Sequence, residues 1–273
     1  MAYDAQTPVA CDVFPIMGQS NAVGTQGTPA IDLNNDCATQ GTPDDANGRI
    51  FQMRQLANGS TIIVADEPLE HFSTVTSARD SSSSIGFSLA FARWYRSNIL
   101  TTGRSILLVP CAVGGSGFSD GNWNPGDTYY ESVITRVNLA VSKHAGNKLI
   151  AMLWHQGEED AAAGWTQNQY QTAFSAMVTD FRSRVTGGNK CRVVVGGLTD
   201  ANQIAHAAYG VINGALADMP NQVAGCVYAS STGLSGNGSN DLHFTASAAR
   251  TLGGVYGTAL QGIFPSLTAN WTA

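Results

Sequence analysis

Short apolar runs alternate along the chain with segments in which apolar residues recur every three or four positions. Five of the runs are bounded by glycine, proline or polar residues, as is typical of strands that are buried on both faces of a sheet. The predicted strands are Val13–Met17, Ser105–Pro110, Lys148–Trp154, Arg192–Gly196 and Val223–Tyr228.

The segments between these runs have the spacing of amphipathic helices. Apolar stripes pass through residues 87–95, 133–141, 170–185, 204–216 and 249–260. Strands that alternate with helices usually pair in parallel, and the connecting helices cover both faces of the sheet. The pattern therefore predicts an α/β fold, a three-layer αβα sandwich around a mostly parallel five-stranded sheet.

The length of 273 residues is near the upper end of what one hydrophobic core serves. We therefore expect a single domain over residues 1–273, with its core at about 13–262. Residues Thr25–Arg49 follow neither periodicity and are rich in Gly, Pro, Asn and Asp, which is typical of a functional loop or a mobile insertion.

Charge and composition argue against several kinds of partner. The net charge is −6, with no basic run to attract a phosphate backbone, so we expect no nucleic-acid partner. The apolar runs are too short to span a bilayer, so we expect no membrane partner. The first residues lack the basic start and apolar core of a secretion signal. Charged residues make up only 12%, a composition common in extracellular and virion proteins, and we expect one of these locations.

Five cysteines leave at least one thiol unpaired within the chain. Cys111, Cys191 and Cys226 lie in or beside apolar runs, where a small buried thiol is the expected state. Cys11 and Cys37 flank the first motif described below, and the sequence leaves open whether they form a disulfide in an oxidising compartment or stay unpaired. No pair or cluster has metal-ligand spacing, so we expect neither a metal nor an organic cofactor.

Four polar blocks follow predicted strands or precede the last predicted helix. The first runs from Gly18 to Asn21 and places Ser20 at the end of a strand, where a nucleophile is exposed and backbone N–H groups are near. The second, residues 112–117, contains glycines that let backbone amides approach a substrate. The third, residues 154–160, holds Gln156, whose side-chain amide is a candidate oxyanion donor. The fourth, residues 240–245, contains His243 as a candidate general base and Thr245 as a helix N-cap.

Together the blocks resemble the SGNH hydrolase superfamily, and more narrowly its sialate O-acetylesterase and acetylxylan-esterase branch. That branch has a GQSN block, a glycine block, a W-x-QGE-x-D block and a late D-x-x-H. The resemblance extends to Glu67–Leu69, Gly86–Ser88 with Phe91–Arg93, and Tyr130–Glu131, and covers about residues 13–262. It implies a flavodoxin-like SGNH fold and a carboxylic ester hydrolase.

The resemblance assigns roles to individual residues. Ser20 is the nucleophile and His243 the general base. The oxyanion hole consists of the backbone N–H groups of Ser20 and one glycine of the second block, for which we favour Gly115 over Gly114, together with the Gln156 side chain. Two further residues match the third block and are expected to support the loop that positions Gln156; they are Glu158 and Asp160.

The acid is where this chain departs from the family pattern. The family's acid lies three residues before the histidine, where this chain has Asn240, and Asp241 lies only two residues before His243. Either the loop shifts so that Asp241 reaches His243, or Asn240 accepts the Nδ1–H through its amide oxygen, or a Ser–His dyad uses another acceptor. We favour Asp241.

The resemblance implies a serine esterase that removes acetyl or other small acyl groups from an acetylated carbohydrate. Two alternatives stay open, an SGNH esterase acting on lipids or thioesters and a glycan-binding or viral tail module with a degenerate site. Oligomeric state is not predicted. The remaining histidines are not expected to be catalytic, although His71 is a candidate for lining the pocket; the others are His144, His155 and His206. Trp123 is expected either to stack on sugar or to pack within its loop.

Overall fold

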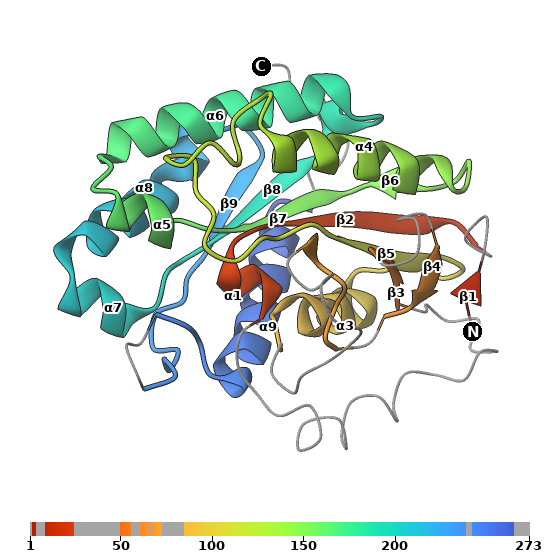
Figure 1. The fold of residues 1–273 in the computed structure, drawn as a ribbon. Coiled ribbons are helices and arrows are strands. Elements are labelled where there is room, and N and C mark those ends of the chain that lie inside the picture. Colours follow the sequence, from red (N-terminus) through yellow and green to blue (C-terminus); the bar gives the residue numbers. More distant parts are fainter. Residues whose placement is uncertain are drawn as a thin grey trace.

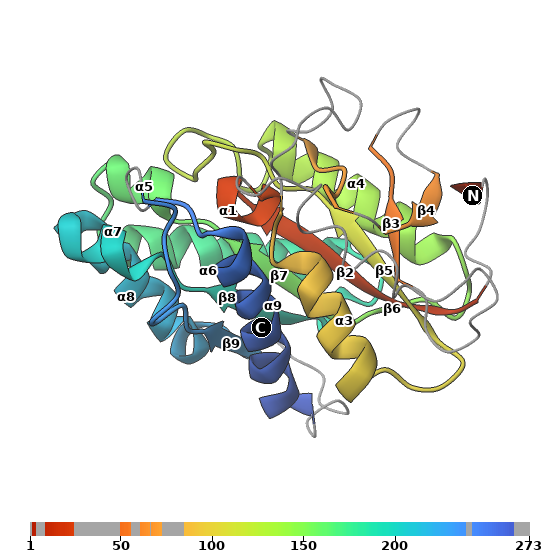
Figure 2. The same ribbon diagram turned by 90° about the horizontal axis from the view of Figure 1, so that it is seen from below.

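The computed structural model describes residues 2–3, 9–24, 50–55, 61–65, 67–72, 85–238 and 242–264. Within these residues, one sheet lies between two layers of helices, so the molecule has the predicted three layers (Figure 1). Figure 2 views the same arrangement from below, with two long helices, α3 and α9, lying side by side over that face of the sheet.

Five adjacent parallel strands correspond to the five predicted ones. In spatial order they are β5 (Ser105–Pro110), β2 (Cys11–Gly18), β7 (Ala151–His155), β8 (Arg192–Gly196) and β9 (Cys226–Ala229). The first of these strands in the chain thus lies between the second and the third. This is the flavodoxin-like doubly wound order, which places a switch point between β2 and β7.

The predicted count of five strands is wrong, because the sheet has nine among the described residues. Strand β3 (Ile50–Met53) extends the sheet in parallel beside β5, and β4 (Ile62–Val64) and β1 (Ala2–Tyr3) follow in antiparallel pairing. A short strand, β6 (Lys148–Leu149), pairs with β2 just ahead of β7. The edge strands have two to four residues each, too few for a period to be recognised in the sequence.

Helices cover the two faces in two groups (Figure 1). One face carries α4 (Thr128–Ser142), α6 (Gln167–Arg184) and α8 (Ala207–Gln222), and the other carries α3 (Ser88–Asn98) and α9 (Ala246–Gly262). The stripe predicted over 204–216 is divided at His206 between α8 and a short α7 (Asp200–Ala205). Three short elements also lie within the described chain: α1 (Ser20–Val23), α5 (Glu158–Ala162) and a 3₁₀ turn, η4 (Gly188–Lys190).

Successive strand residues bury their side chains on opposite faces. Val13 of β2 joins the core under α4, α6 and α8, whereas its neighbour Phe14 joins the core under α3 and α9. In β7, Trp154 and Leu153 divide between the same two cores. Both faces are therefore apolar, which explains why the central strands appear in the sequence as continuous apolar runs.

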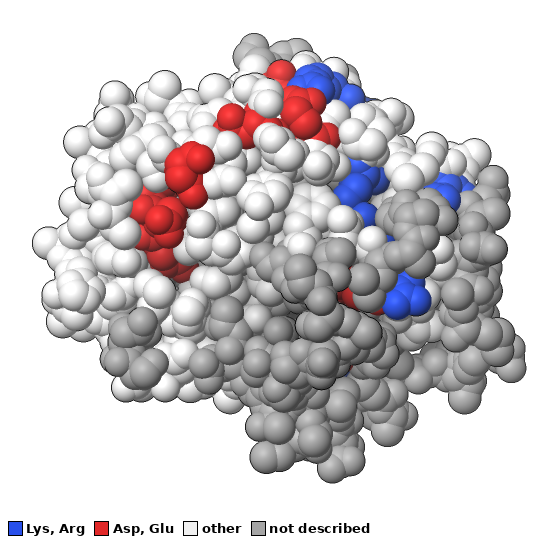
Figure 3. Space-filling model, in the orientation of Figure 1, with Lys and Arg blue, Asp and Glu red and all other residues white. Residues whose placement is uncertain are grey.

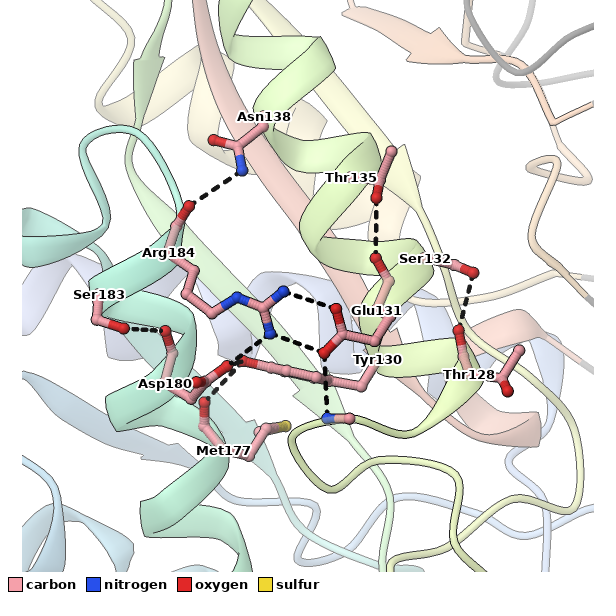
Figure 4. Close-up of polar contacts among 11 residues, drawn as sticks. Thr128, Tyr130, Glu131, Ser132, Thr135, Asn138, Met177, Asp180, Ser183 and Arg184 are labelled. Atoms are coloured by element: carbon pink, nitrogen blue, oxygen red, sulfur yellow. Dashed lines mark hydrogen bonds and ion pairs between the residues drawn. The ribbon is translucent and has the colours of Figure 1, made fainter.

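Polar contacts fix α4 beside α6 on their shared face (Figure 4). The Arg184 guanidinium donates to both carboxylate oxygens of Glu131, at 2.7 and 2.6 Å. Next to this pair, the Tyr130 hydroxyl donates to Asp180 at 2.7 Å. These contacts connect the first turn of α4 to the last turn of α6.

Candidate active site

The predicted blocks meet at the carboxyl edge of the sheet, at its switch point. Ser20 follows β2, the third block follows β7, and the glycine block follows β5, so residues far apart in the sequence lie at one end of three neighbouring strands (Figure 1). Open α/β sheets bind ligands at this position because the connections diverge there and leave a crevice.

Ser20 and His243 form a hydrogen bond, with 2.9 Å between Ser20 Oγ and His243 Nε2. Both side chains are partly exposed, so the pair can be reached from solvent. Gly18 permits the close approach of β2 to β7 that brings the serine here. Its φ is +123°, and a Cβ there would lie 2.0 Å from the His155 carbonyl oxygen. A residue with a side chain at position 18 would therefore force the two strand ends apart.

Burial lowers the pKa of His243 below its ordinary value. Loss of solvation disfavours the charged imidazolium, so the ring stays neutral to lower pH than a solvated histidine. A neutral Nε2 that faces a serine hydroxyl is the state a general base requires.

Asn21, the residue after the serine, holds the backbone on both sides of His243. Its Nδ2 donates to the Leu242 carbonyl at 3.1 Å, and its Oδ1 accepts from the Phe244 N–H at 3.2 Å. The same Nδ2 donates to Glu158 Oε1 at 2.6 Å. The nucleophile's own helix thus fixes the segment that carries the base, although the sequence assigned Asn21 no role.

Glu158 lies at the start of α5 with only 2% of its surface exposed. Its Oε1 accepts from Asn21, and its Oε2 has no partner in the part of the chain that the structure describes. Burial raises the pKa of Glu158 to about 7, against the opposing effect of the Asn21 hydrogen bond. The carboxyl group thus contacts Asn21, whereas the sequence placed it with the loop around Gln156.

Gln156 is fully buried and gives its amide to other protein groups. Its Nε2 donates to Gln19 Oε1 at 3.1 Å and to Asp160 Oδ2 at 2.7 Å, and the Tyr170 hydroxyl donates to its Oε1 at 3.1 Å. Both amide hydrogens are therefore used. The prediction that this side chain faces a reacting oxygen does not fit this geometry, in which Gln156 connects the first and third blocks.

Asp160 connects the third block to the loop that follows the glycine block. Besides accepting from Gln156, it accepts from the Ser119 N–H at 2.7 Å and from the Phe118 N–H at 3.3 Å. Burial raises the pKa of this carboxyl group. The contacts are those expected of a residue that supports the Gln156 loop.

The predicted oxyanion hole uses two backbone amides, those of Ser20 and Gly115. Ser20 is the first residue of α1, so its N–H has no acceptor within the helix. Gly115 has a φ of +61° at an exposed turn, and a Cβ there would meet nothing within 4 Å. Open space next to a glycine turn suits a bound ester, because the amide can approach the ligand closely.

Asn240 and Asp241 lie outside the described residues, so the acid stays a prediction. Among the described residues, the only hydrogen bond of the His243 ring is the one to Ser20. Cys37 also lies outside them. Cys11, the other cysteine of this candidate disulfide, is buried at the start of β2.

Three residues considered in the sequence are core residues instead of ligand contacts. His71 is fully buried and accepts from the Ala112 N–H through Nδ1, and burial lowers its pKa to about 3. His155 points away from the site, as predicted, and its Nδ1 lies 3.0 Å from the Tyr256 hydroxyl. Trp123 is 0% exposed and donates to Ser116 Oγ, so packing within its loop is the correct alternative.

The surface around these elements carries few charges. Figure 3 shows a face on which most described atoms belong to uncharged residues, in keeping with the 12% of charged residues in the chain. Among the described residues, no group of three or more His, Cys, Asp or Glu is arranged to hold a metal ion. No helix in this part of the chain is both long and apolar enough to cross a membrane.

The sheet has a doubly wound α/β order, with Ser20 after the first of its five predicted parallel strands and His243 before its last helix. The chain belongs to the family described as "Carbohydrate esterase, sialic acid-specific acetylesterase", which it matches over residues 10–261.

Two curated relatives match shorter segments. A probable carbohydrate esterase of Arabidopsis thaliana is 30% identical over 98 residues, and a probable 9-O-acetyl-N-acetylneuraminic acid deacetylase of Escherichia coli K12 is 30% identical over 93 residues. These segments cover 36% and 28% of this chain, and the same shares of the relatives. The match therefore spans about a third of each relative's length.

Solved structures share the fold over nearly the whole chain. NanS superposes with a TM-score of 0.74 at 20% identity, covering 95% of this chain and 99% of its own. The Arabidopsis thaliana protein superposes with a TM-score of 0.70 at 22% identity, covering 93% and 99%. At identities of 20% and 22%, the likeness shows a shared fold and nothing finer.

Proposed function

We propose that the protein is a serine esterase that removes acetyl groups from carbohydrate. The observation that carries the proposal is the 2.9 Å hydrogen bond between Ser20 Oγ and His243 Nε2, at the switch point of a carbohydrate-esterase fold. A nucleophile paired with a neutral base is what acyl transfer requires. A module that only binds glycans has no need of this pair.

Acylation begins when Ser20 Oγ attacks the ester carbonyl carbon and His243 Nε2 takes the hydroxyl proton. The carbonyl oxygen becomes an oxyanion, and the tetrahedral intermediate collapses by breaking the bond to the sugar oxygen. His243 gives its proton to that oxygen, so the sugar leaves as an alcohol. Water then attacks the acyl-serine with His243 again as base, which releases acetate and restores Ser20.

The oxyanion hole in this proposal consists of the backbone N–H groups of Ser20 and Gly115. The Ser20 N–H, which has no acceptor within its own helix, and the open exposed turn at Gly115 support it. Gln156 acts from behind the site, because its amide holds Gln19 and Asp160. Asp241 remains the proposed orienting acid of His243, with Asn240 as the alternative acceptor.

The substrate class follows from the relatives' names. The family description names sialic-acid-specific acetylesterases, and the Escherichia coli relative is named for an O-acetylated sialic acid. We therefore propose an O-acetylated sugar as substrate, with acetylated sialic acid to be compared first against acetylated xylan.

The test is hydrolysis of a chromogenic acetyl ester by the wild type and four variants: Ser20→Ala, His243→Ala, Asn240→Ala and Asp241→Ala. We expect Ser20→Ala and His243→Ala each to lose at least about 10⁴-fold in kcat. Of Asn240→Ala and Asp241→Ala, the variant with the larger loss of kcat identifies the partner of His243. Wild-type protein that is inert towards acetyl esters, longer acyl esters and acetylated glycans would refute the proposal and favour a binding module.

A further inference from the structure

A cavity lies at the opposite end of the sheet from Ser20. Its volume is about 490 Å³, and it is bounded by the amino-terminal parts of β2, β6 and β8 together with the ends of α4, α6 and α9. This volume is within the usual range for small-molecule sites. The esterase chemistry uses none of its residues.

Four cationic side chains line this cavity, against one carboxylate. They are Arg104, Lys148, Lys190 and Arg192, and the carboxylate is Asp12. The chain as a whole has a net charge of −6 and only 14 Lys and Arg, so this is an unusual concentration of positive charge.

Asp12 is already used by other groups of the protein. Arg104 Nε donates to its Oδ1 at 2.7 Å, and the Tyr95 hydroxyl donates to its Oδ2 at 2.8 Å. Arg104 also donates to the carbonyl oxygens of Cys11 and Gly146. Asp12 and Arg104 thus neutralise each other, so the positive charges of Lys148, Lys190 and Arg192 remain without a lining carboxylate.

Arg192 has no counter-charge within the described chain. Its side chain lies against the Phe264 ring, with 5.5 Å between Cζ and the ring centroid, and the residue is only 2% exposed. Its Nε and Nη2 have no hydrogen-bond partner among the described residues. A buried guanidinium without a partner is costly, and native proteins rarely keep one unless something else satisfies it.

We propose that this cavity binds a small organic anion, with Arg192 as its counter-charge. The ligand carries one carboxylate or phosphate group, which the Arg192 guanidinium binds together with the lining Lys148 and Lys190. An apolar body completes it, because Ile99, Leu149, Ile150 and Phe264 also line the cavity and a bare inorganic ion would leave most of the volume unfilled.

Calorimetric titration and thermal unfolding test this with four probes: benzoate, phenyl phosphate, inorganic phosphate and the neutral benzyl alcohol. We expect a saturable rise in Tm with benzoate or phenyl phosphate, and the stronger of the two identifies the anionic group. Inorganic phosphate should bind more weakly, and benzyl alcohol should not bind. Equal binding of benzyl alcohol, or no binding of either aromatic anion, would overturn the proposal.

The variant Arg192→Met separates a ligand-binding role from a structural one. We expect it to weaken anion binding about tenfold or more, because a charge-assisted hydrogen bond is lost. Its Tm without anion should rise, since an uncompensated buried charge is removed. A structural arginine would give the opposite change in Tm. Ester hydrolysis should be unaffected, because Ser20 lies at the other end of the strands.

Two further variants complete the test. Lys143→Gln removes one charge near the cavity from a residue that does not line it, and it should keep wild-type affinity. Lys148→Gln combined with Lys190→Gln removes two lining charges and should weaken binding, which covers the case in which Arg192→Met fails to fold. Wild-type affinity in that double variant, or in Arg192→Met, would refute the site.

Discussion

At the scale of single residues, Asn21 is a positioning residue for His243. Its amide contacts the backbone of Leu242 and Phe244, so His243 lies between two fixed points. For Asn21→Ala we expect kcat to fall about 100-fold with little change in KM, because the base moves while the ester-binding surface remains. Steady-state kinetics on a chromogenic acetyl ester measure both constants.

Asn138→Ala is the matched control for this prediction. Asn138 also binds one backbone carbonyl and one backbone N–H, those of Arg184 and Thr186, but on the α4–α6 face. Its loss should leave kcat unchanged. If Asn21→Ala kept wild-type kcat, or if both variants lost activity equally, Asn21 would have no specific role in positioning the base.

The ring of His243 gives a prediction about the acid limb of the pH profile. Because burial lowers its pKa, the base form persists below the ordinary value of 6.5. We expect kcat/KM to rise with pH through a midpoint below 6.5. A midpoint at or above 6.5, measured on an ester whose own ionisation is constant, would contradict this assignment.

Glu158 gives a prediction about stability. Its pKa is raised to about 7 in the folded protein from 4.5, so the folded state holds the proton more tightly. Its contribution to stability is therefore complete below pH 4.5 and is lost as pH rises to about 7. Relative to Glu158→Gln, the wild type should lose about 3 kcal/mol of unfolding free energy over this range. Urea unfolding at several pH values measures it.

Glu131 supplies a control of opposite sign. The hydrogen bond from Arg184 lowers its pKa, so its contribution is present above its unfolded pKa and is lost as pH falls. The free energy of unfolding of Glu131→Gln should therefore fall relative to that of the wild type as pH rises. This is the reverse of the change expected for Glu158→Gln. The same direction in both variants would mean that Glu158 is not protonated in the folded protein near neutral pH.

The sequence was sufficient to propose Ser20 and His243, because each follows or precedes a recognisable element and belongs to a known block. It could not assign the amide contacts of Asn21 and Gln156. Those depend on which side chains meet across more than 130 positions of sequence, as Asn21 and Glu158 do. Residue type alone does not distinguish an amide that faces substrate from one that faces a carboxylate.

At the scale of elements, the cap of α9 connects helix stability to the site. Thr245, which lies two residues after His243, is the N-cap, as predicted. Its side chain accepts a hydrogen bond from the Ala248 N–H at 3.2 Å. We expect Thr245→Ala to cost about 1 kcal/mol in stability. It should also lower kcat, because the loop that carries His243 enters the helix through this cap. Unfolding and ester hydrolysis are measured on the same sample.

Thr166→Ala tests whether the activity loss comes from the site or from general instability. Thr166 caps α6 and forms a capping box with Gln169, far from the His243 loop in sequence. It should lose comparable stability with no change in kcat. Equal losses of kcat in the two cap variants would show that the α9 cap has no special connection to His243.

Element boundaries were predicted well where the apolar run ended at a polar residue or glycine. The strands Ser105–Pro110 and Arg192–Gly196 have the predicted bounds. The strand predicted from Val223 begins three residues before the actual start of β9 at Cys226. Val223 instead follows the end of α8 and is buried there. Apolar side chains at a helix end are indistinguishable in sequence from the start of a strand.

At the scale of the whole molecule, the parallel sheet has two chemically different ends. The carboxyl edge carries Ser20 and His243, and the amino edge carries the cationic cavity around Arg192. The sequence predicted the first, because it is built from contiguous blocks. It gave no indication of the second, whose charged residues come from four separate segments and converge only when the strands align in parallel.

Burial of the sheet on both faces also determines the reactivity of the thiols. Cys111, Cys191 and Cys226 are at most 5% exposed, and burial raises the pKa of Cys111 to about 11 and those of the other two to about 12. Since the thiolate is the reactive form, native protein should not be alkylated at these positions. We expect iodoacetamide to label them only as fast as the whole domain unfolds, which peptide mapping by mass spectrometry measures.

The same peptide map also decides whether Cys11 and Cys37 form a disulfide, because a linked pair gives one joined peptide until it is reduced. Rapid native labelling of Cys191, which is buried directly before β8, would mean that the sheet opens without global unfolding. Labelling confined to Cys226 would place the opening at β9, the edge strand next to α8. Cooperative protection of all three requires the two cores to unfold together, because the thiols belong to the core under α4, α6 and α8 while the opposite face of the same strands packs against α3 and α9.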